Sequence, residues 1–169
     1  GSWKIGDTSS ASSRLGQSPL RSPSVFNFFR PGYVPPGTAL SATGATAPEF
    51  QLVNESTVSG YLNFMQGVIE RGINCPEPGV PQAAWTNYAY DVQANYSREL
   101  ALVADATALV NHVCLVLAAN QISSASRATM VSALNATPVT TASSDTLKRR
   151  RIWATILMVM ACPEYLIQK

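Results

Sequence analysis

The chain has 169 residues, of which 46% are hydrophobic and 13% are charged, and its formal net charge is +2. A chain of this length can bury one sizeable core, whereas two domains would leave both cores thin. The small charge excludes the strong positive field with which nucleic-acid-binding proteins attract phosphate, and no apolar run reaches the roughly 20 residues that a membrane span requires.

The N-terminal region has the composition of an arm rather than of a helix or strand. Residues 1–24 are rich in Ser, Gly and Thr, and their apolar residues follow neither the helical nor the strand periodicity. We therefore expect an extended, poorly ordered segment there. The stretch 22–37, SPSVFNFFRPGYVPPG, then combines aromatic side chains with prolines, which prevent a long helix. We expect Phe26, Phe28 and Phe29 to be buried across the helices, and residues 25–169 to form a single helical domain.

The first long helix is predicted over residues 56–71, with Asn54 or Ser56 as its cap and Gly72 at its end. Its apolar positions recur at steps of three and four residues: Val58, Tyr61, Leu62, Met65, Val68 and Ile69. Residues 73–95 contain prolines and glycine-bearing turns and are interpreted as an extended loop, with a short strand-like stretch in WTNYAYDVQANY as the alternative.

Three further helices are expected in the C-terminal half before the last one. A short helix begins at residue 97, and Asp105 caps the next, which ends near residue 120. Ser123 or Ser124 caps a helix through Leu134. The inward positions should be Leu109, Val113, Val116 and Leu117 on the second helix, and Ala128, Val131 and Leu134 on the third.

The last helix is predicted from Asp145, as its cap, to about residue 161, with Pro163 opening a closing turn. Its stretch 152–162 carries no charge and only Thr155 as a polar side chain, and a run of eleven residues is too short for a bilayer. Such a helix belongs in a core, and we expect the others to pack around it. The predicted fold is all-α: an irregular bundle of four to five helices with a long, extended, proline- and aromatic-rich N-terminal arm.

Familiar catalytic and metal motifs do not occur. Cys75, Cys114 and Cys162 are 39 and 48 residues apart, which matches no zinc or redox spacing, and we interpret them as packing residues. In an oxidising compartment, one disulfide that includes Cys75 is the alternative. His112 is the only histidine and sits at the border of its helix's apolar face, where a structural role is more common than a catalytic one. We expect no metal and no cofactor.

Four blocks resemble the bacterial domain of unknown function 1800 (DUF1800) family. They are LGQSPLRSPSVFNFFRPGYVPPG, APEFQLVNESTVSGYLNFM, DVQANYSRELALVADATALVNHV and ACPEYLIQK, and they follow the family's order over nearly the whole chain. The resemblance implies the C-terminal part of a longer bacterial protein with a periplasmic or extracellular location. It supplies no catalytic residues. Cys162 departs from the family pattern, which usually has Ser before PEYL.

Two groups of side chains are candidates for binding. The first surrounds the aromatic segment, where an arginine can stack on a ring while its fork binds a carboxylate, and consists of Asn27, Arg30, Tyr33, Glu49 and Asn63. An internal Arg30–Glu49 clamp is the structural alternative. The second is an anion patch at the start of the last helix, where the helix dipole disfavours cations, and consists of Lys148, Arg149, Arg150 and Arg151. Its alternative is solvation and pairing with Glu99, Asp105 or Glu164.

Three functional hypotheses follow. The leading one is a structural or interaction module of an exported bacterial protein, whose partner is the remainder of its own longer chain, another exported protein or a second copy. The second is an enzyme whose active site is shared with a missing N-terminal portion. The third, weaker hypothesis is anion or polysaccharide binding through Tyr33, Trp85, Tyr88 and the arginines 149–151. No nucleic-acid partner is expected.

Overall fold

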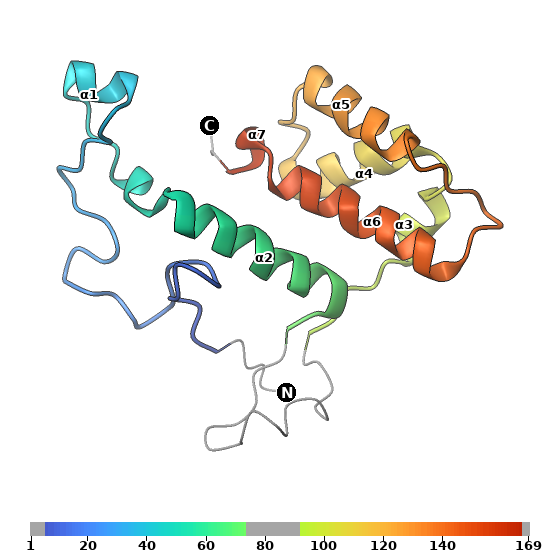
Figure 1. Ribbon diagram of the computed structural model, residues 1–169, viewed down its shortest axis with the longest axis horizontal. Coiled ribbons are helices and arrows are strands. Elements are labelled where there is room, and N and C mark those ends of the chain that lie inside the picture. The colour runs from blue at the N-terminus through green and yellow to red at the C-terminus, as the bar shows by residue number, and fades with distance from the viewer. Residues whose placement is uncertain (1–5, 74–91, 167–169) are drawn as a thin grey trace. The chain divides into compact units, whose positions relative to one another are not determined.

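The computed structural model describes residues 6–73 and 92–166 (Figure 1). Within those residues the regular elements are helices and no strand is formed, which confirms the predicted all-α class. The chain divides into two compact units, Gly1–Val92 and Gln93–Lys169. The boundary between them falls inside the range 25–169 that was expected as one domain.

The N-terminal unit contains one long helix. Its elements are α1 (Ala39–Thr43), a 3-10 turn η1 (Pro48–Leu52) and α2 (Glu55–Arg71), so α2 begins one residue before the predicted range. Asn54 caps α2 as predicted. Its side chain accepts from the Thr57 amide at 3.0 Å, and the Thr57 hydroxyl accepts from the Asn54 amide at 2.9 Å, which completes a capping box. On the predicted apolar face Ile69 is buried, but Val58 is 47% exposed.

The arm forms a closed loop against α2. The Leu15 amide donates to the Thr8 carbonyl at 3.1 Å, and the Thr8 hydroxyl donates to the Gln17 carbonyl at 2.6 Å. The Arg14 guanidinium lies over the Phe64 ring of α2, 5.7 Å from its centroid, in a cation–π arrangement. At Gly60 the loop backbone approaches α2 so closely that a Cβ would lie 2.9 Å from the carbonyl carbon of residue 12. The contact therefore requires glycine, which has no side chain, at this position.

The aromatic segment is less buried than predicted. Phe26 is 59% exposed, so the expectation of its burial is wrong, whereas Phe28 and Phe29 are half-buried. The segment is fastened through its backbone instead. The Arg30 amide donates to Gln51 Oε1 and the Ala47 amide donates to the Tyr33 carbonyl, each at 2.8 Å. These bonds hold the segment beside η1 without requiring every ring to be covered.

The C-terminal unit consists of α3 (Ser97–Leu102), α4 (Ala106–Ala118), α5 (Ser124–Asn135), α6 (Asp145–Met160) and α7 (Pro163–Leu166). The predicted caps Asp105 and Ser123 are confirmed, since each side chain accepts from amides of the following turn. The predicted cap of α6 is wrong by one residue: the Ser144 hydroxyl accepts from the Leu147 amide at 3.3 Å. Asp145 is then the first helical residue, where its negative charge interacts favourably with the positive end of the helix dipole.

The core of this unit is shared by two helices. α4 and α6 contact each other, and each of them also contacts α3, α5 and α7. α6 is therefore central, as predicted, but it shares that position with α4. Their fully buried side chains are Leu109, Val110, Cys114, Ile152, Thr155 and Val159. The only hydroxyl among them is that of Thr155, which donates to the Arg151 carbonyl at 2.8 Å. Its hydrogen-bonding capacity is therefore satisfied although it is buried.

The inward face of α5 differs from the predicted one. Leu134 is buried as expected and Val131 is half-buried, but Ala128 is exposed. Met130 is buried in its place, at 4% exposure. Because methionine is unbranched and flexible, it fills the irregular space between helices that a small alanine would leave open.

Side-chain hydrogen bonds tie α7 to the start of α5. The hydroxyls of Ser123 and Ser126 donate to Glu164 Oε1 at 3.0 and 2.8 Å. Hydrogen bonds to the ionised carboxylate stabilise its charged form, with Ser126 as the largest cause, and they lower the pKa of Glu164 to about 2. The closing helix is therefore held by a charge-assisted contact.

We predict that Gly60→Ala destabilises the N-terminal unit by about 1–3 kcal/mol, because the added methyl group meets loop backbone rather than a movable side chain. Gly67→Ala is the matched control in the same helix. Its Cβ meets only the end of the Arg71 side chain, so the helix propensity gain of up to about 1 kcal/mol should appear there. Thermal unfolding of both variants checks the prediction, and equal shifts would contradict it.

We predict that Glu164→Gln reduces the acid sensitivity of the C-terminal unit. Since the pKa in the folded chain, about 2, lies below the ordinary value of 4.5, the carboxylate stabilises the fold above pH 4.5 and loses that contribution as pH falls toward 2. Urea unfolding from pH 6 to pH 2 should show a shallower decline for Glu164→Gln than for the natural chain. Ser126→Ala should act in the same direction, and an unchanged pH slope in both variants would refute the contact's role.

Candidate functional site

The predicted binding residues near the aromatic segment are only partly brought together. Hydrogen bonds of their backbone place Arg30 and Tyr33 beside the segment that holds Glu49. Within the described part of the chain, no hydrogen bond joins these residues to Asn63 on α2. Among the described residues Arg30 and Glu49 form no ion pair, so the proposed clamp is replaced by the bond to Gln51. Within this set Tyr33 is half-buried, and the exposed members are Asn27, Arg30, Glu49 and Asn63.

The four residues of the predicted anion patch differ in their exposure to solvent. Arg149 and Arg150 are exposed, while Lys148 is half-buried and lies 4.0 Å from Asp145. Arg151 is buried at 6% exposure, and its Nη1 donates to the Thr137 carbonyl at 3.3 Å. Burial lowers the pKa of Arg151, and Asp105 opposes that shift. Two arginines thus remain for an anion, and the aromatic residues 85 and 88 of the polysaccharide hypothesis lie outside the described residues.

The described cysteines have the environment of packing residues. Cys114 is fully buried in α4, Cys162 is half-buried at the end of α6, and both are free thiols. Burial is the main cause that raises the pKa of both thiols, so each stays protonated rather than becoming a nucleophilic thiolate. The alternative of a disulfide with Cys75 falls on a residue outside the described part of the chain.

A groove lies where the apolar stripe of α4 continues beyond the helices that cover it. Val116 and Leu117 follow Leu109 and Val113 at helical steps and were expected to be buried, but they are 63% and 36% exposed. The prediction is wrong for these two residues, because the buried side of the helix turns toward Cys114 and Ala118, which are 0% and 8% exposed. The resulting groove has a volume of 290 Å³ and is lined by Ala94, Asn95, Tyr96, Glu99, Val113, Val116, Leu117 and Ile156.

One carboxylate lines this mostly apolar groove. Glu99 of α3 lines it, and His112 Nε2 of α4 lies 2.9 Å from Glu99 Oε1. Both side chains are largely buried, at 16% and 21% exposure. Burial, with a smaller contribution from Glu99, raises the pKa of Tyr96, which therefore stays a neutral phenol on the groove wall. This arrangement offers an apolar surface with a negative group and an aromatic ring beside it, and we call it the α4 groove.

The α4 groove was missed by sequence reasoning for identifiable reasons. Glu99 was considered as a partner of the arginine cluster, and His112 as an isolated border residue. They are 13 positions apart on different helices, and no motif has that spacing. The apolar stripe that continues to Leu117 could have indicated the groove. The pattern alone, however, does not show which of its side chains a neighbouring helix covers.

Two further observations concern metal binding and membrane insertion of the described residues. His, Cys, Asp and Glu side chains form no group of three or more there that could hold a metal ion. In the same parts of the chain every helix is too short or too polar to span a bilayer.

We predict that Arg151→Ala destabilises the C-terminal unit by about 1–3 kcal/mol, because it removes a buried aliphatic stem and leaves a carbonyl unpaired. Arg150→Ala, one position away and exposed, is the control and should change the unfolding free energy by less than about 0.5 kcal/mol. Chemical denaturation of the two variants measures the difference. Equal effects would mean that the arginine cluster acts as one solvated patch.

The comparisons with known proteins give one finding. A family model described as a protein of unknown function, DUF1800, matches residues 4–167. No curated protein and no solved structure shows a significant match. Since the match covers nearly all of the 169 residues, the chain belongs to the DUF1800 family.

Proposed function

We propose that this chain is a structural or interaction module of an exported bacterial protein, and that the α4 groove is its binding surface. The partner is a protein segment that presents an apolar side chain next to a basic one. It belongs to the remainder of a longer chain or to another exported protein. The low charged fraction of 13%, typical of exported bacterial proteins, supports the location.

The observation that carries this proposal is the exposure of Val116 and Leu117 on an ordered helix. Two adjacent large apolar side chains at 63% and 36% exposure retain free energy that burial against a partner would release, about 25 cal/mol per Å². Both side chains line a groove rather than a convex surface. A concave apolar site with few polar groups is the usual form of a binding site.

The chemistry of the partner follows from Glu99 and Tyr96. A carboxylate at 16% exposure interacts more strongly with a cation than one in bulk water, because the surrounding dielectric constant is lower. A cation of the partner would share Glu99 with His112, whose Nε2 lies 2.9 Å from Glu99 Oε1. Tyr96 contributes an aromatic wall, and aromatic faces attract ammonium and guanidinium groups. A lysine or arginine beside a leucine-like side chain satisfies both surfaces of the groove, whereas an acidic segment would face repulsion.

We predict that the groove binds hexylammonium more tightly than hexanol, and hexanol more tightly than hexanoate. These probes share an apolar tail and differ only in head-group charge. Chemical shifts of the Val116 and Leu117 methyl groups report binding, with a dissociation constant on the order of 1 mM or weaker for so small a ligand. Glu99→Gln should remove the preference for the ammonium, while Glu70→Gln, an exposed control on α2, should retain it.

Two results would contradict the proposal. Tighter binding of hexanoate than of hexylammonium would show that the groove does not select cations. Concentration-dependent dimerisation in sedimentation experiments, abolished by Val116→Glu and retained by Val58→Glu, would instead identify a second copy of the chain as the occupant. Val58 is the control because it is an apolar side chain of similar exposure, 47%, on α2.

A further inference from the structure

The single imidazole of the chain contacts the carboxylate of the α4 groove. His112 is the one histidine in the sequence, and its Nε2 lies 2.9 Å from Glu99 Oε1. Glu99 lines the groove, whereas His112 does not belong to the lining residues. Glu99 is therefore the side chain through which His112 can act on a ligand in the groove.

The low exposure of this pair makes its charge important for the groove. The side chains of His112 and Glu99 are 21% and 16% exposed, and charges so far removed from water interact more strongly than charges on the surface. Burial, followed by the negative charge of Glu99, raises the pKa of Tyr96 on the groove wall. The electric field of the carboxylate thus extends across the surface that a ligand would contact.

The other charged side chains on the helices that contact α4 have different surroundings. On α5, Arg127 donates to the carbonyls of Asn120 and Ile122. On α7, Glu164 accepts from two serine hydroxyls at the start of α5. The remaining ones on α3 and α6 are exposed, paired with one another or bonded to the loop before α6: Arg98, Asp145, Lys148, Arg149, Arg150 and Arg151. In the described part of the chain, Glu99 is therefore the charged group that pairs with His112.

The negative charge that a ligand meets at Glu99 depends on the protonation of His112. Histidine is the side chain that ordinarily gains or loses its charge between pH 5 and pH 8. Protonated His112 forms an ion pair with Glu99 and compensates the carboxylate. Neutral His112 can still donate a hydrogen bond from Nε2, but the carboxylate then retains its full charge for a cation in the groove.

We propose that His112 is a pH sensor, which weakens the binding of a basic segment to the α4 groove as the pH falls below neutral. This inference rests on the proposed function of the groove and adds its regulation. On acidification a proton from the solvent binds the imidazole, and the positive charge beside Glu99 repels the cation of the partner. By linkage, a bound cation must in turn displace that proton to the solvent. An uncharged ligand experiences neither effect.

The test compares hexylammonium with hexanol at pH 5.5 and pH 7.5, within the range in which histidine ordinarily titrates. An alkylammonium resembles the lysine head group, with a pKa of about 10.4, and stays charged at both values. Methyl shifts of Val116 and Leu117 report binding. We expect hexylammonium to bind about 5-fold or more weakly at pH 5.5, as is usual for coupled sites, and hexanol to bind equally at both.

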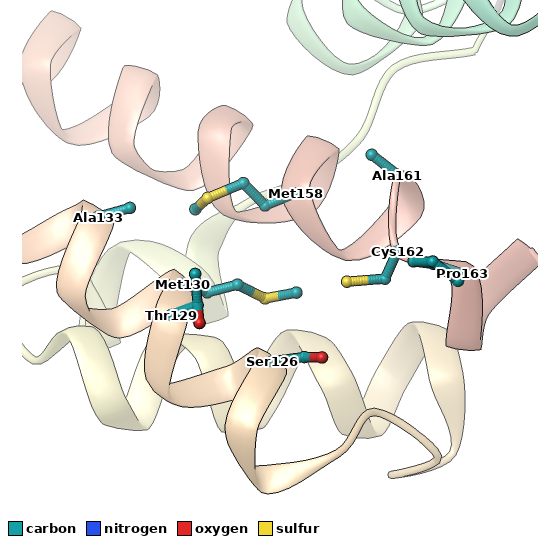
Figure 2. A pocket seen from close by; sticks show the side chains of 8 residues that line it. All are labelled: Ser126, Thr129, Met130, Ala133, Met158, Ala161, Cys162 and Pro163. Carbon is teal, nitrogen blue, oxygen red and sulfur yellow. The ribbon is translucent and has the colours of Figure 1, made fainter.

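A second hollow in the C-terminal unit provides an internal control for the probes. It has a volume of 340 Å³ and lies between α5, α6 and the start of α7, and Figure 2 shows Met130, Met158 and Cys162 among its lining residues. This lining contains neither a carboxylate nor an imidazole. The ε-methyl signals of Met130 and Met158 therefore distinguish a hexyl chain bound there from one bound in the α4 groove.

The imidazole itself gives an independent readout in the natural chain. Because the sequence has one histidine, the C2 proton signal of an imidazole belongs to His112. Adding hexylammonium at pH 6.5 should move this signal toward its position in neutral imidazole, and hexanol should not. A histidine with a purely structural role would not respond to the charge of the head group.

Two variants locate the origin of the pH dependence. His112→Gln keeps a donor near the position of Nε2 but carries no charge at any pH, so the affinity for hexylammonium should become equal at both pH values. Glu164→Gln is the matched control, since it removes a carboxylate of the same unit that does not line the groove. The pH dependence should persist in that variant.

The outcomes separate this proposal from the function on which it rests. Equal binding of hexylammonium at both pH values, with its preference over hexanol preserved, would overturn the pH sensor and leave the proposed function intact. No preference for hexylammonium at either pH would overturn both. Full pH dependence in His112→Gln would show that Glu99 itself titrates, which would also overturn the role of His112.

Discussion

The contact between α4 and α6 is the interaction on which the C-terminal unit depends. Leu109, Val110 and Cys114 on one helix and Ile152 and Val159 on the other are all fully buried. Each of the two helices also contacts α3, α5 and α7. The smaller helices have no comparable contacts of their own, so their positions, and both cavities, follow from this pair. Substituting a side chain in it would therefore disturb more than local packing.

The sequence predicts the helices well because local signals determine them. Capping residues at Asn54, Asp105 and Ser123 mark helix starts, and each accepts the hydrogen bond that its type favours. The miss at Ser144 has the same origin, since a serine and an aspartate in succession are both good caps. Burial is predicted less well, as at Val116 and Ala128, because it depends on where a neighbouring helix ends, and that information is not local.

The candidate sites illustrate this limit more strongly. The expected binding residues were chosen by composition, from aromatic and basic stretches, yet Arg151 is a buried structural residue and Arg30 is fastened through its amide. Glu99 with His112, and Met130 with Met158, come together only through the tertiary contacts of different helices. Neither pair follows from spacing along the chain. Both require knowing that α4 and α6 are the common neighbours of every other helix in the unit.

Helix geometry also separates the two cavities. Ile156 lines the α4 groove and Met158 lines a second hollow, together with Met130 and Cys162. Two residues along an α-helix correspond to a rotation of about 200°. The two spaces therefore lie on different sides of α6, with the buried stripe of Ile152, Thr155 and Val159 belonging to the core. Any influence of one on the other would have to pass through α6 itself, by a shift of that helix against α4, and a tightly packed α4–α6 contact resists such a shift.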